Sequence, residues 1–165
     1  MDLFVLRHGE AGKHSAIPSD SLRALTAAGR QEMVEIAKGL EKLGIEFDHV
    51  FSSPLTRAKQ TAIIALKYVK SKNNIENADE LRPEGNRLEL YTRLSKLKQS
   101  SIVLLVGHEP YLSELISEAI SGDLDDRIDL KKGGLARINV IKFLPKIQGE
   151  LRWLLPPKVM KKFSK

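Results

Sequence analysis

The fold is decided by the stretch LFVLRHG, residues 3–9, near the start of a chain of 165 residues. Its four apolar residues follow one another without polar alternation, which indicates a strand buried on both faces, as in a parallel sheet. The run ends at an arginine, a histidine and a glycine, where we expect the chain to turn sharply into a loop. Ligands bind beyond the carboxyl ends of parallel strands, so a functional site is expected to begin here.

The same pattern of strand, special residues and helix recurs twice further along the chain. VFSS at residues 50–53 reads as a strand, and Pro54 opens a helix to about residue 70 with Arg57 in its first turn. IVLLV at 102–106 runs into GHEP at 107–110, after which another helix begins. We therefore expect three neighbouring strand ends to bring His8, Arg57 and His108 together.

The remaining segments complete an α/β pattern. A helix is expected from Thr26 to Gly44, a polar stretch over 71–85, and two closing strands at 134–144 and 150–155 that form a hairpin. A further helix carries one apolar face, formed by Leu88, Tyr91, Leu94 and Leu97. Strands that alternate with helices predict a three-layer α/β/α fold with a mainly parallel, mixed central sheet.

Length and charge favour one domain with a basic end. The formal net charge is +6, but four lysines and no acid lie in residues 158–165, which leaves +2 for residues 1–157. We expect a single domain over 1–157 and a solvated basic tail over 158–165. The chain has no cysteine, no signal-peptide pattern and no apolar run long enough to span a membrane, which predicts a cytoplasmic protein. Aromatic residues make up only 5%, so no nucleic-acid partner and no membrane are expected.

Two histidines and two arginines at the strand ends point to an anion site. The neighbouring Arg7 favours a neutral His8, which is the form a nucleophile needs. Arg57 in the first turn of a helix suits a phosphate dianion. Metal catalysis is disfavoured, because none of the four histidines are paired at i, i+4 and Arg7 would repel a cation. No P-loop motif is present either.

Four motifs, in this order, resemble those of the histidine phosphatase superfamily, the phosphoglycerate mutase-like proteins. They are LRHGE at 6–10, LTxxG at 25–29, SSPxxRAxQT at 52–61 and VGHEP at 106–110. The short chain, ELRPxG at 80–85 and WxxxP at 153–157 make it most similar to the SixA-type phosphohistidine phosphatases.

The resemblance implies a role for each motif residue. His8 would be the nucleophile that becomes phosphohistidine, and Arg7, Arg57 and His108 would hold the phosphoryl oxygens. The backbone at Gly9 and the N–H group of Glu109 would add to the phosphate site. Neither a metal nor another cofactor is implied, and we expect both arginines to lie unpaired until phosphate arrives.

One departure from the family pattern bears on the substrate. Mutases and many phosphomonoesterases carry Leu-x-Glu to protonate an alkoxide, whereas this chain has Pro83 in that place, flanked by Glu80 and Glu84. Imidazole leaving from a P–N bond needs less help from an acid, which favours phosphohistidine on a protein. The short connections at 71–86 and 121–133 predict an open site that could admit a protein.

Two alternatives stay open at this point. One is a phosphomonoesterase for small sugar or nucleotide phosphates, in which Glu80 or Glu84 would serve as the acid. The other is a non-catalytic phospho-binding module. His14 follows the nucleophile motif and could contact phosphate, and the oligomeric state does not follow from the sequence.

Overall fold

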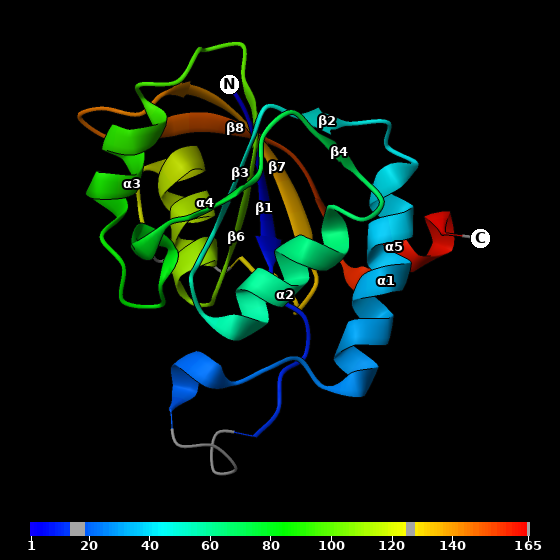
Figure 1. Ribbon diagram of the computed structural model, residues 1–165. Helices are drawn as coiled ribbons and strands as arrows, with labels where there is room; N and C mark the ends of the chain where they lie inside the picture. Colours follow the sequence, from blue (N-terminus) through cyan, green and yellow to red (C-terminus); the bar gives the residue numbers. More distant parts are fainter. Residues whose placement is uncertain (14–18, 125–127, 165) are drawn as a thin grey trace.

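A six-stranded mixed sheet forms the middle layer of the protein in the computed structural model, which describes residues 1–13, 19–124 and 128–164 (Figure 1). The strand order is β5-β3-β6-β1-β7-β8, in which β5, β3, β6 and β1 are parallel, β7 is antiparallel to β1, and β8 is antiparallel to β7. The strands are β1 (Asp2–Arg7), β3 (His49–Ser52), β5 (Ile75–Asn77), β6 (Ile102–Gly107), β7 (Leu135–Lys142) and β8 (Gln148–Leu155). The expected α/β fold and its closing hairpin are confirmed.

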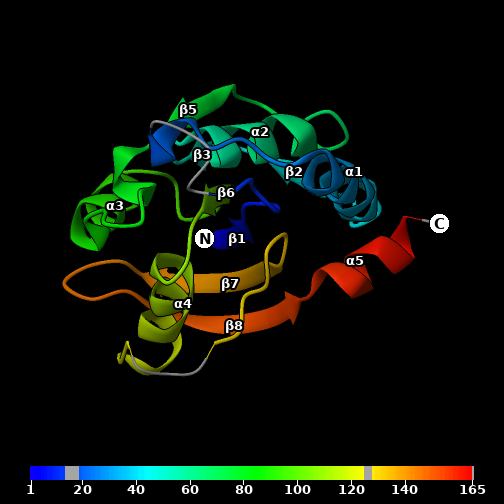
Figure 2. The same cartoon turned by 90° about the horizontal axis from the view of Figure 1, so that it is seen from below.

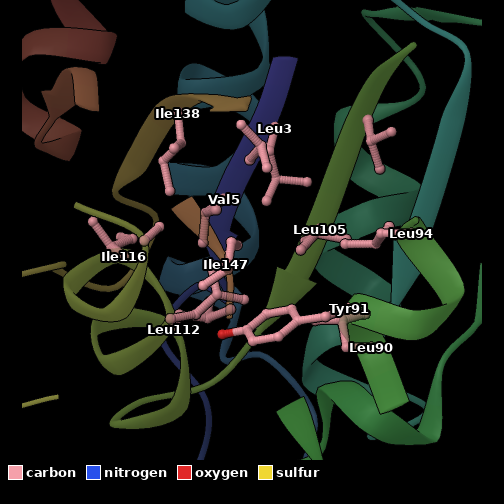
Figure 3. Close-up of a cluster of buried hydrophobic side chains, with 14 of the residues drawn as sticks. Leu3, Val5, Leu90, Tyr91, Leu94, Leu105, Leu112, Ile116, Ile138 and Ile147 are labelled. Carbon is pink, nitrogen blue, oxygen red and sulfur yellow. The ribbon is translucent and has the colours of Figure 1, made fainter. Parts of the chain in front are cut away.

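Helices cover both faces of this sheet, as Figure 2 shows from the carboxyl end of β1. On one side lie α1 (Ala27–Glu41), α2 (Thr56–Ala65) and α5 (Pro157–Phe163), and on the other lie α3 (Arg87–Leu94) and α4 (Tyr111–Ser121). Leu3 and Val5 pack toward α3 and α4 (Figure 3), whereas Phe4 and Leu6 pack toward α1 and α2. These four side chains are at most 1% exposed, which explains why β1 reads as an unbroken apolar run.

One expectation about local structure was wrong, and the polar stretch contains elements that its sequence did not indicate. The helix after Pro54 begins at Thr56 and ends at Ala65, because the chain then turns into the two-residue strand β4 (Lys70–Ser71), which pairs with β2 (Glu46–Phe47). The polar stretch 71–85 contains β5, an edge strand paired with β3, and the 3-10 helix η3 (Asp79–Leu81). An edge strand with one solvated face carries little apolar signal, so the pattern did not indicate it.

The buried face of α3 also differs from the predicted one. Leu88 is 56% exposed, whereas Leu90, Tyr91 and Leu94 are buried. Leu97 lies beyond the end of the helix and packs at the edge of the same cluster. The helix is therefore rotated so that Leu90 and not Leu88 faces the sheet.

The expected solvated tail at 158–165 is, over its described residues, largely the helix α5. Met160 is fully buried against α1, and Lys161 Nζ lies 2.7 Å from a carboxylate oxygen of Glu32. A Cβ atom on Gly39 of α1 would come within 2.2 Å of the Met160 carbonyl oxygen, so only glycine permits this close approach. The apolar residue within the lysine-rich end anchors it to the domain. No helix in the described part of the chain is long and apolar enough to cross a membrane.

Candidate active site

His8, Arg57 and His108 meet at the carboxyl end of the sheet, as the positions of the three strands require. His8 follows β1 and His108 follows β6, and the His8 N–H group donates to the Gly107 carbonyl at 3.1 Å. The centres of the two imidazole rings lie 5.0 Å apart. Arg57 enters from the first turn of α2, and its Nε lies 3.3 Å from Nε2 of His8.

The hydrogen bonds of His8 define which ring nitrogen is free to react. Nδ1 lies 2.7 Å from the Gly9 carbonyl oxygen, which can only accept, so Nδ1 carries the proton. Nε2 then holds a lone pair and accepts the Nε–H group of Arg57. This tautomer directs the nucleophilic lone pair toward the guanidinium group.

Burial keeps both imidazole rings neutral. It lowers the pKa of His8 to about 4; the hydrogen bond to the Gly9 carbonyl opposes this effect, and the charges of Arg57 and Arg7 add to it. Burial likewise lowers the pKa of His108 to about 3, with contributions from His8 and Arg57. At neutral pH His8 therefore has the charge state of a nucleophile.

Arg57 is paired in this structure, contrary to the expectation that it would lie free. Its side chain is only 3% exposed, and its Nη1 and Nη2 atoms lie 3.0 Å from the main-chain carbonyl and the carboxylate of Asp20. Asp20 also accepts from Arg23 Nε at 2.9 Å. A buried guanidinium needs such partners, since an unpaired buried charge is strongly unfavourable. Burial disfavours the ionised carboxyl of Asp20, but the two arginines outweigh it and hold its pKa below the ordinary value.

Arg7 and His108 each keep a buried nitrogen without a hydrogen-bond partner among the described residues. Arg7 donates from Nη1 to the Leu130 carbonyl at 2.9 Å, but its Nε is unpartnered. His108 bonds through Nε2 to the hydroxyl of Ser53 at 2.8 Å, whereas its Nδ1 is unpartnered. Buried polar atoms are normally satisfied, so two such atoms at one strand-end cluster suggest that a polar ligand completes them.

Thr61 connects the nucleophile loop to α2. Its hydroxyl oxygen accepts the Gly9 N–H group at 3.1 Å and donates to the Arg57 carbonyl at 2.8 Å. A Cβ atom at Gly9 would come within 2.6 Å of Met33 Cγ, so this loop packs tightly on α1. The Gly9 N–H group expected at the phosphate is thus engaged by Thr61.

The acidic residues near the site differ in their surroundings. Glu109 accepts from the backbone N–H group and the hydroxyl of Ser113 in the first turn of α4, while burial raises its pKa. Glu80 is held in an ion pair with Arg93 at 3.2 Å. Glu84 is exposed, and its charge helps to raise the pKa of Arg57 against the lowering effect of burial.

Three contributors were not assigned a role from the sequence: Ser53, Thr61 and Asp20. Ser53 and Thr61 stand inside the SSPxxRAxQT motif, and Thr61 lies one helical turn after Arg57. Asp20 begins the 3-10 helix η2 (Asp20–Leu22), a single turn whose place no periodic pattern specifies. His14 lies outside the described residues.

Within the described ranges, no three histidine or carboxylate side chains gather in a way that could hold a metal ion.

Comparisons with known proteins agree with the resemblance that the motifs suggest. The family model for the histidine phosphatase superfamily (branch 1) matches residues 3–83. An uncharacterised protein of Picosynechococcus sp. is 30% identical over 94% of this chain and 100% of its own length. The phosphohistidine phosphatase SixA of Escherichia coli K12 is 31% identical over 74% of this chain and 76% of its own.

A solved structure extends the likeness to the whole fold. It is the protein histidine phosphatase SixA in complex with tungstate, which superposes with a TM-score of 0.85 at 26% identity and covers 96% of this chain and 98% of that one. The motifs, the strand-end site and these relatives all lead to one assignment. The chain belongs to the histidine phosphatase superfamily.

Proposed function

We propose that the protein hydrolyses phosphohistidine on other proteins, with a covalent phosphohistidine formed on His8. The observation that carries this proposal is the neutral His8, whose Nε2 lone pair faces Arg57 while its Nδ1 is bonded to the Gly9 carbonyl. Around it stand the cationic Arg7 and Arg57 and the unpartnered Nδ1 of His108. These groups supply a nucleophile and the donors for phosphoryl oxygens.

The reaction proceeds as two in-line displacements at phosphorus. His8 Nε2 forms a bond to phosphorus while the P–N bond of the substrate breaks, and the departing imidazole nitrogen takes up a proton from solvent. Water then attacks the phosphoryl group while the bond between His8 Nε2 and phosphorus breaks. The electron pair of that bond returns to Nε2, and the proton lost by the water passes to solvent, which leaves phosphate and free His8. Arg7, Arg57 and His108 stabilise the charge on the three equatorial oxygens, which is the main demand of phosphoryl transfer. The backbone N–H group of Glu109 adds a further donor.

His108 changes its protonation state in this scheme. The dianionic phosphoryl group favours a protonated imidazole beside it, against the burial that lowers the pKa of His108 to about 3 in its absence. Protonated His108 can donate from Nδ1 to an oxygen while Nε2 remains bonded to Ser53.

The substrate class follows from the missing acid and from the relatives. Pro83 stands where a carboxyl would protonate an alkoxide, and Glu80 is held by Arg93. Imidazole leaves more readily than an alkoxide, so a site without that acid is better matched to a P–N bond. The SixA relative from Escherichia coli is a phosphohistidine phosphatase by name, which supports the same substrate class. The solved SixA structure holds tungstate, which is a tetrahedral oxyanion like phosphate.

One observation favours the phosphomonoesterase alternative. Glu84 follows Pro83 directly, is exposed and helps to raise the pKa of Arg57, whereas Glu80 is held by Arg93, so Glu84 is the candidate acid for an ester leaving group. This would extend the activity to small phosphate esters. If Glu84 does not act as this acid, the proposed hydrolysis of P–N bonds is unaffected.

A substrate panel with a trapping experiment tests the proposal. A phosphohistidine protein and phosphoramidate should be hydrolysed much faster than glucose 6-phosphate or a nucleotide, and EDTA should not change the rates. A phosphoenzyme that is labile to acid and stable to base should form on the wild type and be absent from His8→Asn. Rapid hydrolysis of esters alone would favour the phosphomonoesterase. Binding without turnover or phosphoenzyme would favour a phospho-binding module. The cytoplasmic location and the independence from metal stay predictions.

A further inference from the structure

A basic groove borders the candidate site on the side of α5. It has a volume of about 590 Å³ and is lined by Arg7, Glu32, Lys131, Lys132, Lys158 and Lys161, together with two prolines at the start of α5. In Figure 2 the segment that leads into β7 lies between the end of β1 and α5. We call this hollow the α5 groove.

Backbone hydrogen bonds tie the α5 groove to the nucleophile. The Gly133 N–H group donates to the carbonyl oxygens of Arg7 at 3.0 Å and of His8 at 3.3 Å. Lys131 and Lys132, which directly precede Gly133, are thereby held beside the catalytic strand end. Arg7 itself belongs both to the candidate site and to the lining of the groove. A chain that presents a phosphoryl group to His8 can therefore continue into the groove.

The lining carries an excess of positive charge. Among the described residues that line it, Glu32 is the only acid, and it is paired with Lys161 at 2.7 Å. Lys131 and Lys132 also contact carboxylates, but those pairs are exposed and contribute little. A second hollow of about 600 Å³ shares Lys158 and Lys161 and adds Lys162, which extends the basic surface along α5. The groove is therefore complementary to a short run of carboxylates.

We propose that the α5 groove binds an acidic segment of the phosphoprotein substrate, next to its phosphohistidine. The proposal rests on the proposed function and names the kind of protein that the site accepts. A segment of chain fits better than a small phosphorylated metabolite, because the groove leads away from the reacting atoms. Among the described residues, the linings of the two hollows include no aromatic side chain on which bases could stack, which disfavours a nucleic acid.

Two phosphohistidine peptides of equal length provide the probe. Each carries a central histidine phosphorylated with phosphoramidate, and the histidine is flanked by four aspartates in one peptide and four asparagines in the other. The wild type should show a kcat/KM about tenfold higher for the aspartate peptide, and added salt should reduce this preference. Equal kcat/KM values for the two peptides would overturn the proposal.

Charge-reversal variants locate the effect. Lys131→Glu combined with Lys158→Glu should remove the preference for aspartate and leave turnover of free phosphoramidate within twofold of the wild type. The matched control is Lys96→Glu with Lys98→Glu, two exposed lysines in a different hollow, beside Asp48 and Ser101. The control should keep the preference. A loss that is equal in both double variants would reflect overall charge and would overturn the assignment to the groove.

A binding measurement separates this proposal from the proposed function. The unphosphorylated aspartate peptide, labelled with a fluorophore, should bind the wild type at low salt and bind the Lys131→Glu, Lys158→Glu variant at least tenfold more weakly. If the protein hydrolyses no P–N bond but the wild type still binds the aspartate peptide more tightly than the variant, the peptide-binding role of the groove is supported and the proposed reaction is wrong. If an oligonucleotide or phosphatidylserine vesicles bind through these lysines while both peptides bind alike, the groove serves that polyanion and the proposal is wrong.

Discussion

The Nε–H group of Arg57 lies 3.3 Å from Nε2 of His8, so the cation and the nucleophile of the site are in direct contact. The contact joins the end of β1 to the start of α2. An anion that binds the guanidinium is thereby within reach of the Nε2 lone pair. Asp20 approaches the same guanidinium with its carboxylate, 3.0 Å from Nη2. A bound phosphoryl group therefore replaces or joins an existing anionic partner of Arg57.

Replacing His8 by asparagine should abolish turnover while preserving the fold. Asparagine can keep a side-chain donor near the Gly9 carbonyl but has no lone-pair nitrogen to attack phosphorus. We expect kcat/KM for phosphoramidate to fall by at least about 10³-fold. Protection by tungstate against thermal unfolding should persist, since Arg7, Arg57 and His108 remain. A variant that keeps most of its rate would contradict the role of His8.

Replacing Arg57 by lysine should lower kcat/KM by about 10²–10³-fold, the range found when one preorganised donor is lost. Lysine keeps the charge but cannot hold Nε–H and two Nη donors in one plane. Arg23→Lys is the matched control, because Arg23 pairs with the same Asp20 but is more exposed. Its effect should stay below about tenfold if the guanidinium of Arg57 acts directly on the phosphoryl group. Equal losses in both variants would indicate that only the anchoring of Asp20 matters.

The meeting of His8, Arg57 and His108 could be predicted because it follows from periodicity. Each residue comes at or just after a short apolar run, and parallel strands place their carboxyl ends at one edge. The layers of the fold were predictable for the same reason, since Leu3 to Leu6 read as buried on both faces.

The partners of these residues could not be predicted in the same way. Asp20 reaches Arg57 from the 3-10 helix η2, and the position of so short an element depends on packing rather than on a repeating pattern. The burial of α5 depends on Met160, the buried residue of a short, lysine-rich helix. Residues 88 and 90 are both leucine, so hydrophobicity alone does not show which of them is buried. The rotation of α3 that buries Leu90 is set by the contacts of the helix with the sheet.

Replacing Thr61 by valine should slow catalysis by about 10-fold to 100-fold through the position of the nucleophile loop. Valine keeps the shape but leaves the buried Gly9 N–H group without its acceptor, which costs about 1–3 kcal/mol of stability. Thr61→Ser keeps the hydroxyl and should restore most of the rate. In ¹⁵N spectra of His8, the valine variant should show a smaller fraction of the Nδ1–H tautomer. An unchanged tautomer with a reduced rate would mean that Thr61 contributes stability alone.

Acidification should destabilise the protein through its two buried histidines. Burial lowers the pKa of His8 to about 4 and of His108 to about 3, below the ordinary value of 6.5. The unfolded chain then binds more protons than the folded one, so the free energy of unfolding falls as the pH drops from about 6.5 toward 4. The expected loss is on the order of 3 kcal/mol per histidine as an upper bound. Urea unfolding at pH 7 and pH 4.5 measures it.

The asparagine variant at position 8 isolates the share of His8 in this effect. Carboxylates such as Asp20 contribute to acid destabilisation in wild type and variant alike, because their pKa is also held low. The drop in stability between pH 7 and pH 4.5 should therefore be smaller in His8→Asn than in the wild type. Drops of equal size would show that His8 is not neutral in the folded protein.

Replacing Glu84 by glutamine should separate ester hydrolysis from P–N hydrolysis. An alkoxide needs a proton as it leaves, whereas a departing imidazole nitrogen needs much less help, so only the ester reaction depends on an acid. We expect Glu84→Gln to leave phosphoramidate turnover within twofold and to reduce any turnover of glucose 6-phosphate by about 10²-fold or more. Glu80→Gln is the control, because Glu80 is paired with Arg93 at 3.2 Å. If P–N turnover falls as steeply as ester turnover in Glu84→Gln, the carboxyl acts on Arg57 or on binding. The absence of the Leu-x-Glu acid would then no longer favour phosphohistidine as the substrate.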